Sequence, residues 1–357
     1  MTKVQRKFHG ITMNKMNFNN TPIDWDQVHG VIEKASRIML TTHENPDGDG
    51  LGSQCGLYHH LNEINKEVRI INYSPLPVEY ENLNVDRIFE TYNESEHNDW
   101  MESTDLVIIF DVGDFVRIRT IVAAIEKYSL KTMNMDHHPH LDDHPFTYNL
   151  VDLSAAATGC MVYDYLQVAR DKPIVKKSLE GIYTAVMTDT GCFRYSNTDN
   201  KCHEIAIECL NIGVETHTIY QRVYENSTIS RMELMGEFLS NLNYELDGCL
   251  AWFVITQDMM NRANATKADV EGFSDMVRTI SGVEVALMIF EQNQSFCRIN
   301  FRSKGKYIVN DIAKSLGGGG HAFAAGAIVS GSLSDVKQMA VQASISSINS
   351  KIDGSNE

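Results

Sequence analysis

The sequence predicts an α/β fold, in which a parallel-sheet domain with flanking helices is joined by a helical linker to a smaller α/β domain. Between Trp25 and about Gln221, short β-rich runs alternate with segments of helical periodicity. Such alternation is typical of a parallel sheet with crossover helices. In addition, 357 residues with 43% apolar content exceed the usual size of one domain and can bury two cores.

The chain is expected to divide into two domains, a linker and two terminal segments. These are a disordered extension over residues 1–23, a first domain over 24–224, a linker over 225–246, a second domain over 247–351 and a tail over 352–357. The linker prediction rests on Ile229–Tyr244, whose apolar residues share one helical face. In the second domain we expect strands over 250–256, 283–291 and 296–302, and a closing helix over 335–348.

Composition and charge exclude several classes of protein. No apolar run approaches the roughly 20 residues that a membrane-spanning helix needs, so no membrane partner is expected. The formal charge of −16 disfavours long nucleic acids as partners, because their phosphates are repelled. The seven cysteines are scattered and include no CxxC pair, so neither a disulfide framework nor a zinc knuckle is expected. Their scatter predicts a cytoplasmic location.

Polar side chains follow three of the strands expected in the first domain, at the point where each run ends. The expected strands are 38–42, 68–72, 105–110 and 132–135. The first, third and fourth stop before groups of Asp, His or Gly residues. Because open α/β sheets bind ligands at the carboxyl ends of their strands, we expect these side chains to meet in one crevice.

His43, Asp47 and Asp49 belong to one tight turn after the first of these runs. Their spacing lets the two carboxylates reach different neighbouring cations, while the imidazole anchors one of them. Asp, Gly and Pro are also ordinary turn residues. Taken alone, this segment is therefore explained equally well by a surface turn without a metal.

Asp111 directly follows the apolar run Leu106–Phe110. A buried carboxylate at that place is costly unless it is paired or binds a metal. The alternative role is a helix N-cap, which fits Asp114 better. For Asp111 we predict metal binding.

His137 and Asp189 complete the candidate ligands. His137 follows a strand, and neutral imidazole is a common ligand of Mn, Fe and Zn. Asp189 ends a helical run, where the helix dipole is already negative, so a bound cation explains a carboxylate there. The nearby Arg194 suits bidentate contact with a phosphate, with a surface salt bridge as the alternative.

Together the candidate ligands form an oxygen-rich set without cysteine, which suits a pair of Mn²⁺ or Mg²⁺ ions. The set consists of His43, Asp47, Asp49, Asp111, His137 and Asp189. Two such ions about 4 Å apart can lower the pKa of a water and clamp a phosphate for in-line attack. The sequence therefore predicts phosphoester hydrolysis.

Five segments of the chain resemble the motifs of a known family. HENPDGDGLGS, FDVGD, DHH and TDTGCFRYSNTD resemble, in this order, the four motifs of DHH phosphoesterases, and GGGGHAFAAG resembles that of the associated substrate-binding domain. The resemblance extends from about Asp24 to Ile348. Within that family, the chain looks like the bacterial nanoRNase and pAp-phosphatase subfamily, which includes stand-alone cyclic-di-AMP phosphodiesterases. The first domain would then be the DHH catalytic domain and the second the DHH-associated domain.

The resemblance also implies a role for each site residue. His43 and Asp47 would bind one manganese ion, Asp49, His137 and Asp189 the other, and Asp111 would bridge both. Asp136 would orient its neighbours from behind the ligands, and His138 would contact the scissile phosphate or support proton transfer. Substrate contacts would come from Arg302, Ser303 and His321, and from Gly318, Gly319 and Gly320, whose N–H groups would face an anion.

Two departures from the family pattern affect the expected substrate. Ala156-Ala157-Thr158-Gly159-Cys160 replaces a stretch that is richer in hydroxyls and carries an acidic residue in the family. After His321, Ala322-Phe323 stands where a polar or basic residue is common. The metal ligands are unaffected.

The resemblance implies a hydrolase with two Mn²⁺ ions per subunit, with Mg²⁺ as the alternative, and a homodimer. The expected substrates are short oligoribonucleotides, cleaved to 5′ mononucleotides, and pAp, converted to AMP. A cyclic-di-AMP phosphodiesterase is one alternative, because it cleaves the same type of bond with the same metals. A nucleotide-binding protein without catalysis is the other.

Overall fold

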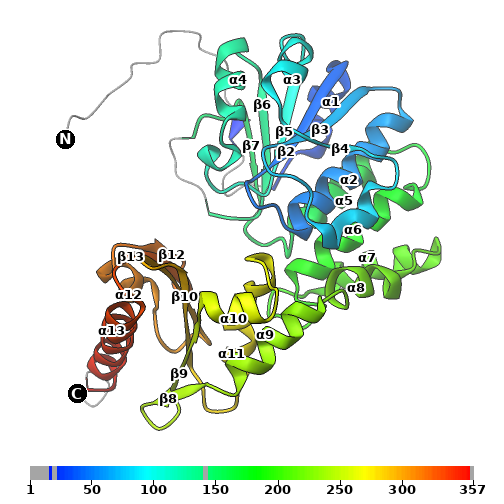
Figure 1. Cartoon of the computed structure of the whole chain (residues 1–357). Coiled ribbons are helices and arrows are strands. Elements are labelled where there is room, and N and C mark those ends of the chain that lie inside the picture. Colours follow the sequence, from blue (N-terminus) through cyan, green and yellow to red (C-terminus); the bar gives the residue numbers. More distant parts are fainter. Residues whose placement is uncertain (1–15, 18–21, 140–143, 354–357) are drawn as a thin grey trace. The chain divides into compact units, whose positions relative to one another are not determined.

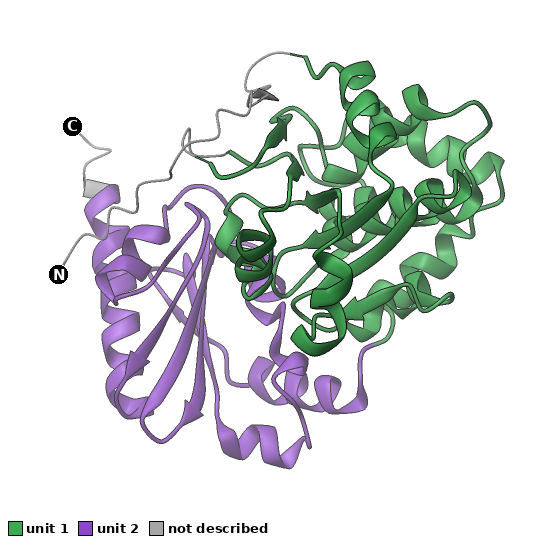
Figure 2. Cartoon of the chain, turned by 90° about the horizontal axis from the view of Figure 1, so that it is seen from above, with its two compact units in different colours: residues 1–226 green, residues 227–357 purple. Residues whose placement is uncertain are grey.

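The structure is a computed structural model that describes residues 16–17, 22–139 and 144–353 (Figure 1). The chain forms two compact units, Met1–Asn226 and Ser227–Glu357 (Figure 2). Most of the N-terminal extension, and the end of the C-terminal tail, lie outside the described residues. Within the extension, Met16–Asn17 form a short strand, β1, where disorder was expected.

Unit 1 is built on a seven-stranded sheet in the order β1-β7-β6-β5-β2-β3-β4. All neighbouring strands are parallel, which confirms the predicted α/β class. The strands after β1 are β2 (Arg37–Thr42), β3 (Glu67–Asn72), β4 (Phe89–Thr91), β5 (Leu106–Phe110), β6 (Thr132–Asp136) and β7 (Tyr148–Val151). Only β4 and β7 lack a counterpart among the expected runs, because they are too short to show a pattern.

The strand order reverses between β2 and β5, at the centre of the sheet. From β2 the chain continues outward to β3 and β4, whereas from β5 it continues in the opposite direction to β6 and β7. Open α/β sheets bind ligands at such a switch point. His43 directly follows β2 and Asp111 directly follows β5, so the sheet itself brings these two residues together.

Helices cover both faces of this sheet (Figure 1), so its central strands are buried on both sides and read as continuous apolar runs. One core lies under α1, α2, α5, α6 and α7, and the other under α3 and α4. The helices of unit 1 are α1 (Trp25–Lys34), α2 (Gly48–Glu63), α3 (Glu94–Met101), α4 (Ile121–Tyr128), α5 (Thr158–Ala169), α6 (Lys176–Asp189), α7 (Asn200–Asn211) and α8 (Thr216–Tyr224), with 3₁₀ turns η1 (Val78–Asn84) and η2 (Phe115–Ile118).

Glycines let α2 and α6 pack with their backbones in close contact. A Cβ atom at Gly52 would lie 2.3 Å from the Gly181 carbonyl oxygen, and one at Gly181 would lie 2.6 Å from the Gly52 carbonyl oxygen. No side chain fits at either position. The glycine-rich start of α2 therefore serves close helix packing, which fixes the two helices that carry Asp49 and Asp189.

Gly52→Val is expected to lower the free energy of unfolding by about 1–3 kcal/mol, because the added atoms overpack the contact with α6. Gly30→Ala in α1 is the matched control, since no atom lies within 4 Å of a Cβ there. That control should raise stability by about 0.5–1 kcal/mol through helix propensity. Chemical denaturation of both variants checks the contact, and an unchanged midpoint for Gly52→Val would contradict it.

Unit 2 contains a six-stranded mixed sheet in the order β12-β13-β11-β10-β9-β8. Its strands are β8 (Asn243–Glu245), β9 (Leu250–Ile255), β10 (Val285–Asn293), β11 (Phe296–Ser303), β12 (Gly319–Gly320) and β13 (Ala324–Ser330). The helices are α9 (Ile229–Leu239), α10 (Gln257–Arg262), α11 (Phe273–Arg278), α12 (Asn310–Ser315) and α13 (Leu333–Asp353), with the 3₁₀ turn η3 (Ala268–Val270).

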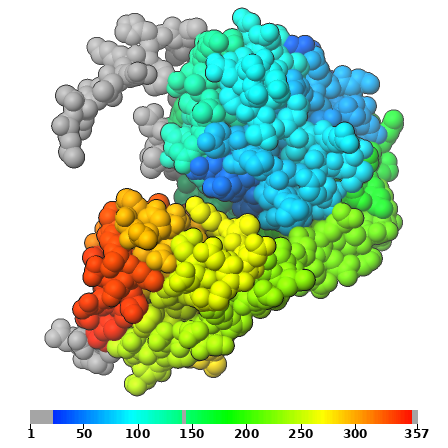
Figure 3. Space-filling view, in the orientation of Figure 1, coloured from blue at the N-terminus to red at the C-terminus, as the bar shows by residue number. Residues whose placement is uncertain are grey.

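The helices of unit 2 cover its sheet on both faces. One core lies against α9, α10 and α11, and the other against α12 and α13. The last helix, α13, lies at the surface of the unit, where Figure 3 shows it in red. Among the described residues, no helix is both long and apolar enough to cross a membrane.

The helix expected over Ile229–Tyr244 is shorter than predicted. It ends at Leu239, and Asn243–Glu245 form β8, which pairs antiparallel with β9. The helix also packs on the sheet of unit 2, because the ring of Phe238 stacks on that of Phe253 with centroids 4.5 Å apart. Its apolar face therefore belongs to the core of unit 2, where the sequence pattern predicted a linker.

Candidate metal centre

His43 stands at the carboxyl end of β2 with its ring nitrogens in two different environments. Nδ1 lies 2.7 Å from the Glu44 carbonyl oxygen, which can only accept a hydrogen bond. Nε2 faces carboxylate oxygens of Asp111 at 3.4 Å and Asp47 at 3.8 Å. Arg117, which no sequence pattern singles out, also approaches Nδ1, with Nη2 at 3.0 Å. Nε2 is therefore the nitrogen available to a cation.

Asp47 uses its two carboxylate oxygens in different ways. Its Oδ1 accepts hydrogen bonds from the backbone N–H groups of Asp49 at 3.1 Å and Gly50 at 3.3 Å, and so caps α2. Its Oδ2 is the oxygen that faces His43. Helix capping and cation binding thus use different oxygens of one side chain.

Asp111 lies at the centre of the site. Its backbone has a positive φ of 58°, which is uncommon for a residue with a side chain. Oδ2 faces His43, while Oδ1 lies 3.7 Å from His137 Nε2 and 3.3 Å from His138 Nδ1. The Asp111 side chain caps none of the helices among the described residues, whereas Asp114 caps η2, as predicted. Burial disfavours the anion, but hydrogen bonds from His138 and His43 hold the pKa of Asp111 well below its usual value.

Asp49 is held by the first turn of α5. Its two oxygens accept hydrogen bonds from the backbone N–H groups of Thr158 at 2.7 Å and Gly159 at 2.9 Å. Ala157, the N-cap of α5, makes no side-chain cap bond, so the carboxylate from α2 replaces the missing cap. This contact gives the Ala156-Ala157 departure a structural explanation. Burial, and then the charges of Asp111 and Asp189, raise the pKa of Asp49 well above its usual value.

His137 supplies the clearest sign of a cation-binding site. Its Nδ1 lies 3.1 Å from the Ala155 carbonyl oxygen, so the proton is on that nitrogen. Nε2 is buried and has no hydrogen-bond partner among the described residues. It faces carboxylate oxygens of Asp49 at 3.6 Å, Asp111 at 3.7 Å and Asp189 at 3.6 Å. A lone pair surrounded by three carboxylates fits a bound cation.

Asp189 is the last residue of α6, as the sequence predicted. Burial raises the pKa of its carboxyl to about 6. Asn197, which the sequence analysis missed, donates through Nδ2 to the Ala156 carbonyl at 2.9 Å and to the Asp189 carbonyl at 3.2 Å. The same amide approaches Asp189 Oδ2 at 3.5 Å. Asn197 therefore ties the end of α6 to the segment that begins α5.

Asp136 and His138 form a pair beside the candidate ligands. Asp136 Oδ1 accepts from the His138 backbone N–H at 3.1 Å and from Nδ1 of the ring at 2.9 Å. Hydrogen bonds to Asp111 and Asp136 raise the pKa of His138 to about 11. The His138 side chain is 41% exposed, whereas Asp136 is fully buried. A buried carboxylate thus orients an accessible, positively charged imidazole.

Within the part of the chain that the structure describes, three groups of side chains could each hold a metal ion. They are His43, Asp47 and Asp111; Asp49, His137 and Asp189; and Asp111, His137 and His138. Asp111 belongs to the first and third groups, so it is the carboxylate placed to reach two ions. Burial disfavours the imidazolium form of His43, yet hydrogen bonds to Asp111 and Asp47 raise its pKa to about 9. The site thus attracts positive charge, which a divalent cation would supply.

Three of the predicted substrate contacts lie outside this cluster, and each already has a partner within the protein. Arg194 is exposed, and its Nε donates to the Gly191 carbonyl at 2.7 Å. In unit 2, Arg302 Nε lies 3.0 Å from Asp275 Oδ2. Ser303 is buried, and its hydroxyl accepts from the Gly305 N–H at 3.1 Å. Their contact with substrate stays a prediction.

Part of the glycine run belongs to the sheet of unit 2. Gly319–Gly320 form β12, which pairs antiparallel with β13. The Gly318 N–H donates to the Ala313 carbonyl at 2.8 Å, and the His321 N–H donates to the Ala324 carbonyl at 2.8 Å. The expectation that all three glycine N–H groups face an anion is therefore wrong for Gly318, because its N–H already has a backbone acceptor.

Comparison with known protein families matches a domain family to each of the two units. Residues 37–187 match the DHH family, N-terminal domain, and residues 251–350 match the DHHA1 domain. The chain is 29% identical to a bifunctional oligoribonuclease and PAP phosphatase NrnA from Bacillus subtilis, over 82% of this chain and 89% of the relative. The protein of that name from Thermus thermophilus is 28% identical, over 87% of this chain and 90% of the relative.

A solved structure supports the fold. An exopolyphosphatase-related protein from Bacteroides fragilis superimposes with a TM-score of 0.83 at 27% identity, covering 89% of this chain and 94% of that one. The match spans most of both chains, so the similarity includes both units of the fold.

Proposed function

The chain belongs to the DHH family of phosphoesterases, and from this premise we propose that it is a manganese-dependent hydrolase of short oligoribonucleotides and of pAp. That it is a hydrolase of phosphoester bonds follows from the family. The observation that carries the metal dependence is His137 Nε2, buried among three carboxylates without a partner in the described residues. The substrates are supported by the names of the relatives, oligoribonuclease and PAP phosphatase.

The proposed ligands divide between two Mn²⁺ ions, with Mg²⁺ as the alternative. His43 and Asp47 hold one ion, Asp49, His137 and Asp189 hold the other, and Asp111 reaches both. Carboxylate and imidazole ligands without thiolate suit these metals. When bound, such a pair polarises a phosphate and lowers the pKa of a water.

His138 is the proposed catalytic residue beside these ligands. Asp136 and Asp111 hold the ring through Nδ1 and keep it protonated. A charged, accessible imidazole can donate a hydrogen bond to a phosphate oxygen and a proton to a leaving oxygen. Asp136 touches no substrate in this scheme and acts as a positioning residue.

The remaining proposals concern substrate binding and assembly. Arg194, Arg302, Ser303, Gly319, Gly320 and His321 are the proposed contacts to phosphate and base. An anionic substrate would compete with Asp275 for Arg302, because the two side chains are paired in the free protein. We also propose a cytoplasmic homodimer, which rests on the family resemblance and the scattered cysteines.

A substrate panel tests the function. With Mn²⁺ present, pApA and oligoribonucleotides of a few residues should release AMP or other 5′ mononucleotides faster than long oligonucleotides, and pAp should yield AMP. Cyclic-di-AMP and pyrophosphate complete the panel. Faster cleavage of cyclic-di-AMP than of pApA would favour a cyclic-dinucleotide phosphodiesterase. No turnover of any substrate by the metal-loaded protein would leave only a nucleotide-binding role.

Asn197→Ala is expected to weaken Mn²⁺ binding roughly tenfold, a loss typical of residues that orient metal ligands. The reason is that its amide holds both Asp189 and the segment before α5. Asn241→Ala is the matched control, because that amide donates only to the Glu237 carbonyl in α9. Calorimetric titration with Mn²⁺ measures both variants. Equal affinities in Asn197→Ala and wild type would refute the positioning role.

A further inference from the structure

The chain leaves α6 through a turn in which three consecutive residues have a positive φ. Gly191, Cys192 and Phe193 have φ values of 55°, 60° and 61°. Left-handed backbone is uncommon for residues with a side chain, and it persists where the surrounding structure holds it, often at functional sites. The turn begins two residues after Asp189, which ends α6. It therefore directly adjoins the candidate metal centre.

Hydrogen bonds to Thr190 hold this turn in one conformation. The Thr190 carbonyl accepts from the N–H groups of Arg194 and Tyr195, both at 3.0 Å. The Thr190 hydroxyl accepts from the Phe193 N–H at 3.0 Å and donates to the Val186 carbonyl at 2.6 Å. The last turn of α6 therefore fixes the backbone of Tyr195.

The ring of Tyr195 lies flat against Gly191. A Cβ atom at Gly191 would lie 2.4 Å from Cζ of the ring, and 2.5 and 2.6 Å from the adjacent Cε1 and Cε2. Nearly equal distances to three adjacent ring atoms put that point over the face of the ring and not beyond its edge. Any side chain at this position would overlap the ring. One face of the ring is therefore covered by the backbone of Gly191.

The opposite face of the same ring is open. Tyr195 is 53% exposed, and among the described residues no other aromatic ring stacks on it. Phe193 in the same turn differs, because it is partly buried and its ring stacks on that of His203 with centroids 5.5 Å apart. The turn thus presents one anchored aromatic ring and one ring with a free face. A ring that is already fixed on one side loses little freedom when a flat ligand covers the other.

The chain approaches the candidate ligand Asp189 on both sides of Tyr195. Gly191, on which the ring rests, is two residues from Asp189, a span of about 7 Å at most. Asn197 follows Tyr195 by two residues and brings its amide to 3.5 Å from Asp189 Oδ2. That oxygen lies 3.6 Å from His137 Nε2. Only one ribose separates the base of a nucleotide from its phosphate, so a nucleotide with its phosphate at the candidate ligands brings its base near this ring.

We propose that the open face of Tyr195 stacks on a nucleobase of the substrate whose phosphate lies at the metal centre. This inference rests on the proposed function and adds to it a base contact in unit 1. Every base has a π face, so stacking on an aromatic side chain accepts any base. Such a contact suits an enzyme that shortens RNA fragments of different sequence. The proposed phosphate contact Arg194 belongs to the same turn, because its Nε donates to the Gly191 carbonyl at 2.7 Å.

Calorimetric titration of the full-length, Mn²⁺-loaded chain with AMP and with ribose 5-phosphate tests the proposal. The two ligands share a ribose and a phosphate, so the ratio of their affinities measures the contribution of the base. In wild type, AMP should bind about tenfold more tightly or better. Tyr195→Leu should lower this ratio about tenfold, a loss typical of one base stacked on an aromatic side chain. Tyr195→Phe keeps the ring and should keep the ratio.

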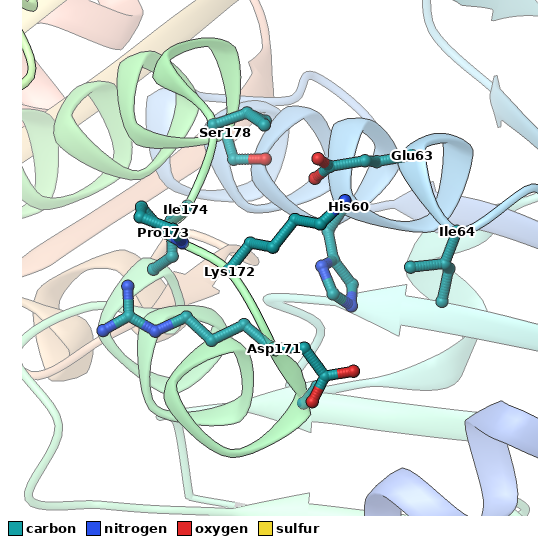
Figure 4. Close-up of a pocket in the computed structure, with 11 residues that line it drawn as sticks. His60, Glu63, Ile64, Asp171, Lys172, Pro173, Ile174 and Ser178 are labelled. Atoms are coloured by element: carbon teal, nitrogen blue, oxygen red, sulfur yellow. The ribbon is translucent and has the colours of Figure 1, made fainter.

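Ile64→Ala is the control for removing an exposed apolar side chain from unit 1. Ile64 is 42% exposed and lines a small pocket of about 160 Å³, where α2 and α5 end and α6 begins (Figure 4). Because α6 has 14 residues, this pocket lies about 20 Å from Asp189 along the helix. The ratio of the two affinities should therefore be that of wild type.

Two further measurements separate stacking from a structural role of the ring. The melting temperature of Tyr195→Leu and its affinity for Mn²⁺ should both stay near those of wild type, because the side chain is exposed. An unchanged ratio of affinities in the folded Tyr195→Leu variant overturns the proposal. So does a lower ratio that is accompanied by an equal loss of Mn²⁺ affinity, or the absence of saturable AMP binding in wild type.

The binding of AMP is measured without turnover, so this proposal and the proposed function fail in different ways. A base preference that depends on Tyr195, in a chain that hydrolyses none of the tested substrates, would refute the proposed function and leave the stacking site. Hydrolysis of pApA by a chain whose base preference is unaffected by Tyr195→Leu would refute the stacking site alone.

Discussion

Asp111→Ala should reduce hydrolysis of pApA by about three orders of magnitude or more, because it removes a ligand that is shared by both proposed ions. The carboxylate faces His43 through one oxygen and both His137 and His138 through the other. Its loss therefore removes a ligand from both proposed metal sites at once. Single-turnover release of AMP at saturating Mn²⁺ is the measurement.

Asp114→Ala is the matched control for this variant. Asp114 lies three residues further along the same segment and caps η2 by accepting from the Val116 N–H at 3.2 Å. Its loss should lower the free energy of unfolding by about 0.5–2 kcal/mol, as for other N-caps, and leave the rate of hydrolysis near that of wild type. Retention of wild-type activity in Asp111→Ala would refute the shared role.

Asp49→Ala should lower the free energy of unfolding of the metal-free protein by about 3–5 kcal/mol. The carboxylate accepts the N–H groups of Thr158 and Gly159, and its removal leaves two buried donors unpaired. Ser53→Ala is the control, because the Ser53 hydroxyl makes only a long contact of 3.4 Å with Asp49. Denaturation in the presence of a chelator measures both.

This second prediction separates the structural role of Asp49 from metal binding. If Asp49 served the metal alone, its replacement by Ala would leave the metal-free protein as stable as wild type or more stable, because a carboxylate repelled by Asp111 and Asp189 would be gone. A marked loss of stability without metal supports the capping of α5. An unchanged or higher stability would contradict it.

The parts of the site that the sequence predicted are those that depend on strand ends. Apolar runs mark β2, β5 and β6, and parallel strands bring their carboxyl ends to one edge. His43, Asp111 and His137 follow directly from that geometry. The N-cap of η2 by Asp114 was also predictable, because helix capping is a local interaction between residues close in the sequence.

The contacts that the sequence did not reveal join distant segments. Asp49 and the N–H of Thr158 are 109 residues apart in the chain, so the cap of α5 has no local signal. Asn197 likewise meets Ala156 across 41 residues. The burial of Leu234 and Phe238 in the core of unit 2 was not predictable either, because periodicity alone does not show which core an amphipathic face joins.

The proposed hydrolysis would need two metal ions, with Asp111 as the ligand that both share. Stepwise addition of Mn²⁺ to the metal-free protein, with bound metal and AMP release from pApA measured on the same samples, tests it most directly. We expect AMP release to stay near background at the first equivalent per chain and to reach its maximum as the second binds. Full release with one bound ion, or in the metal-free protein, would contradict it.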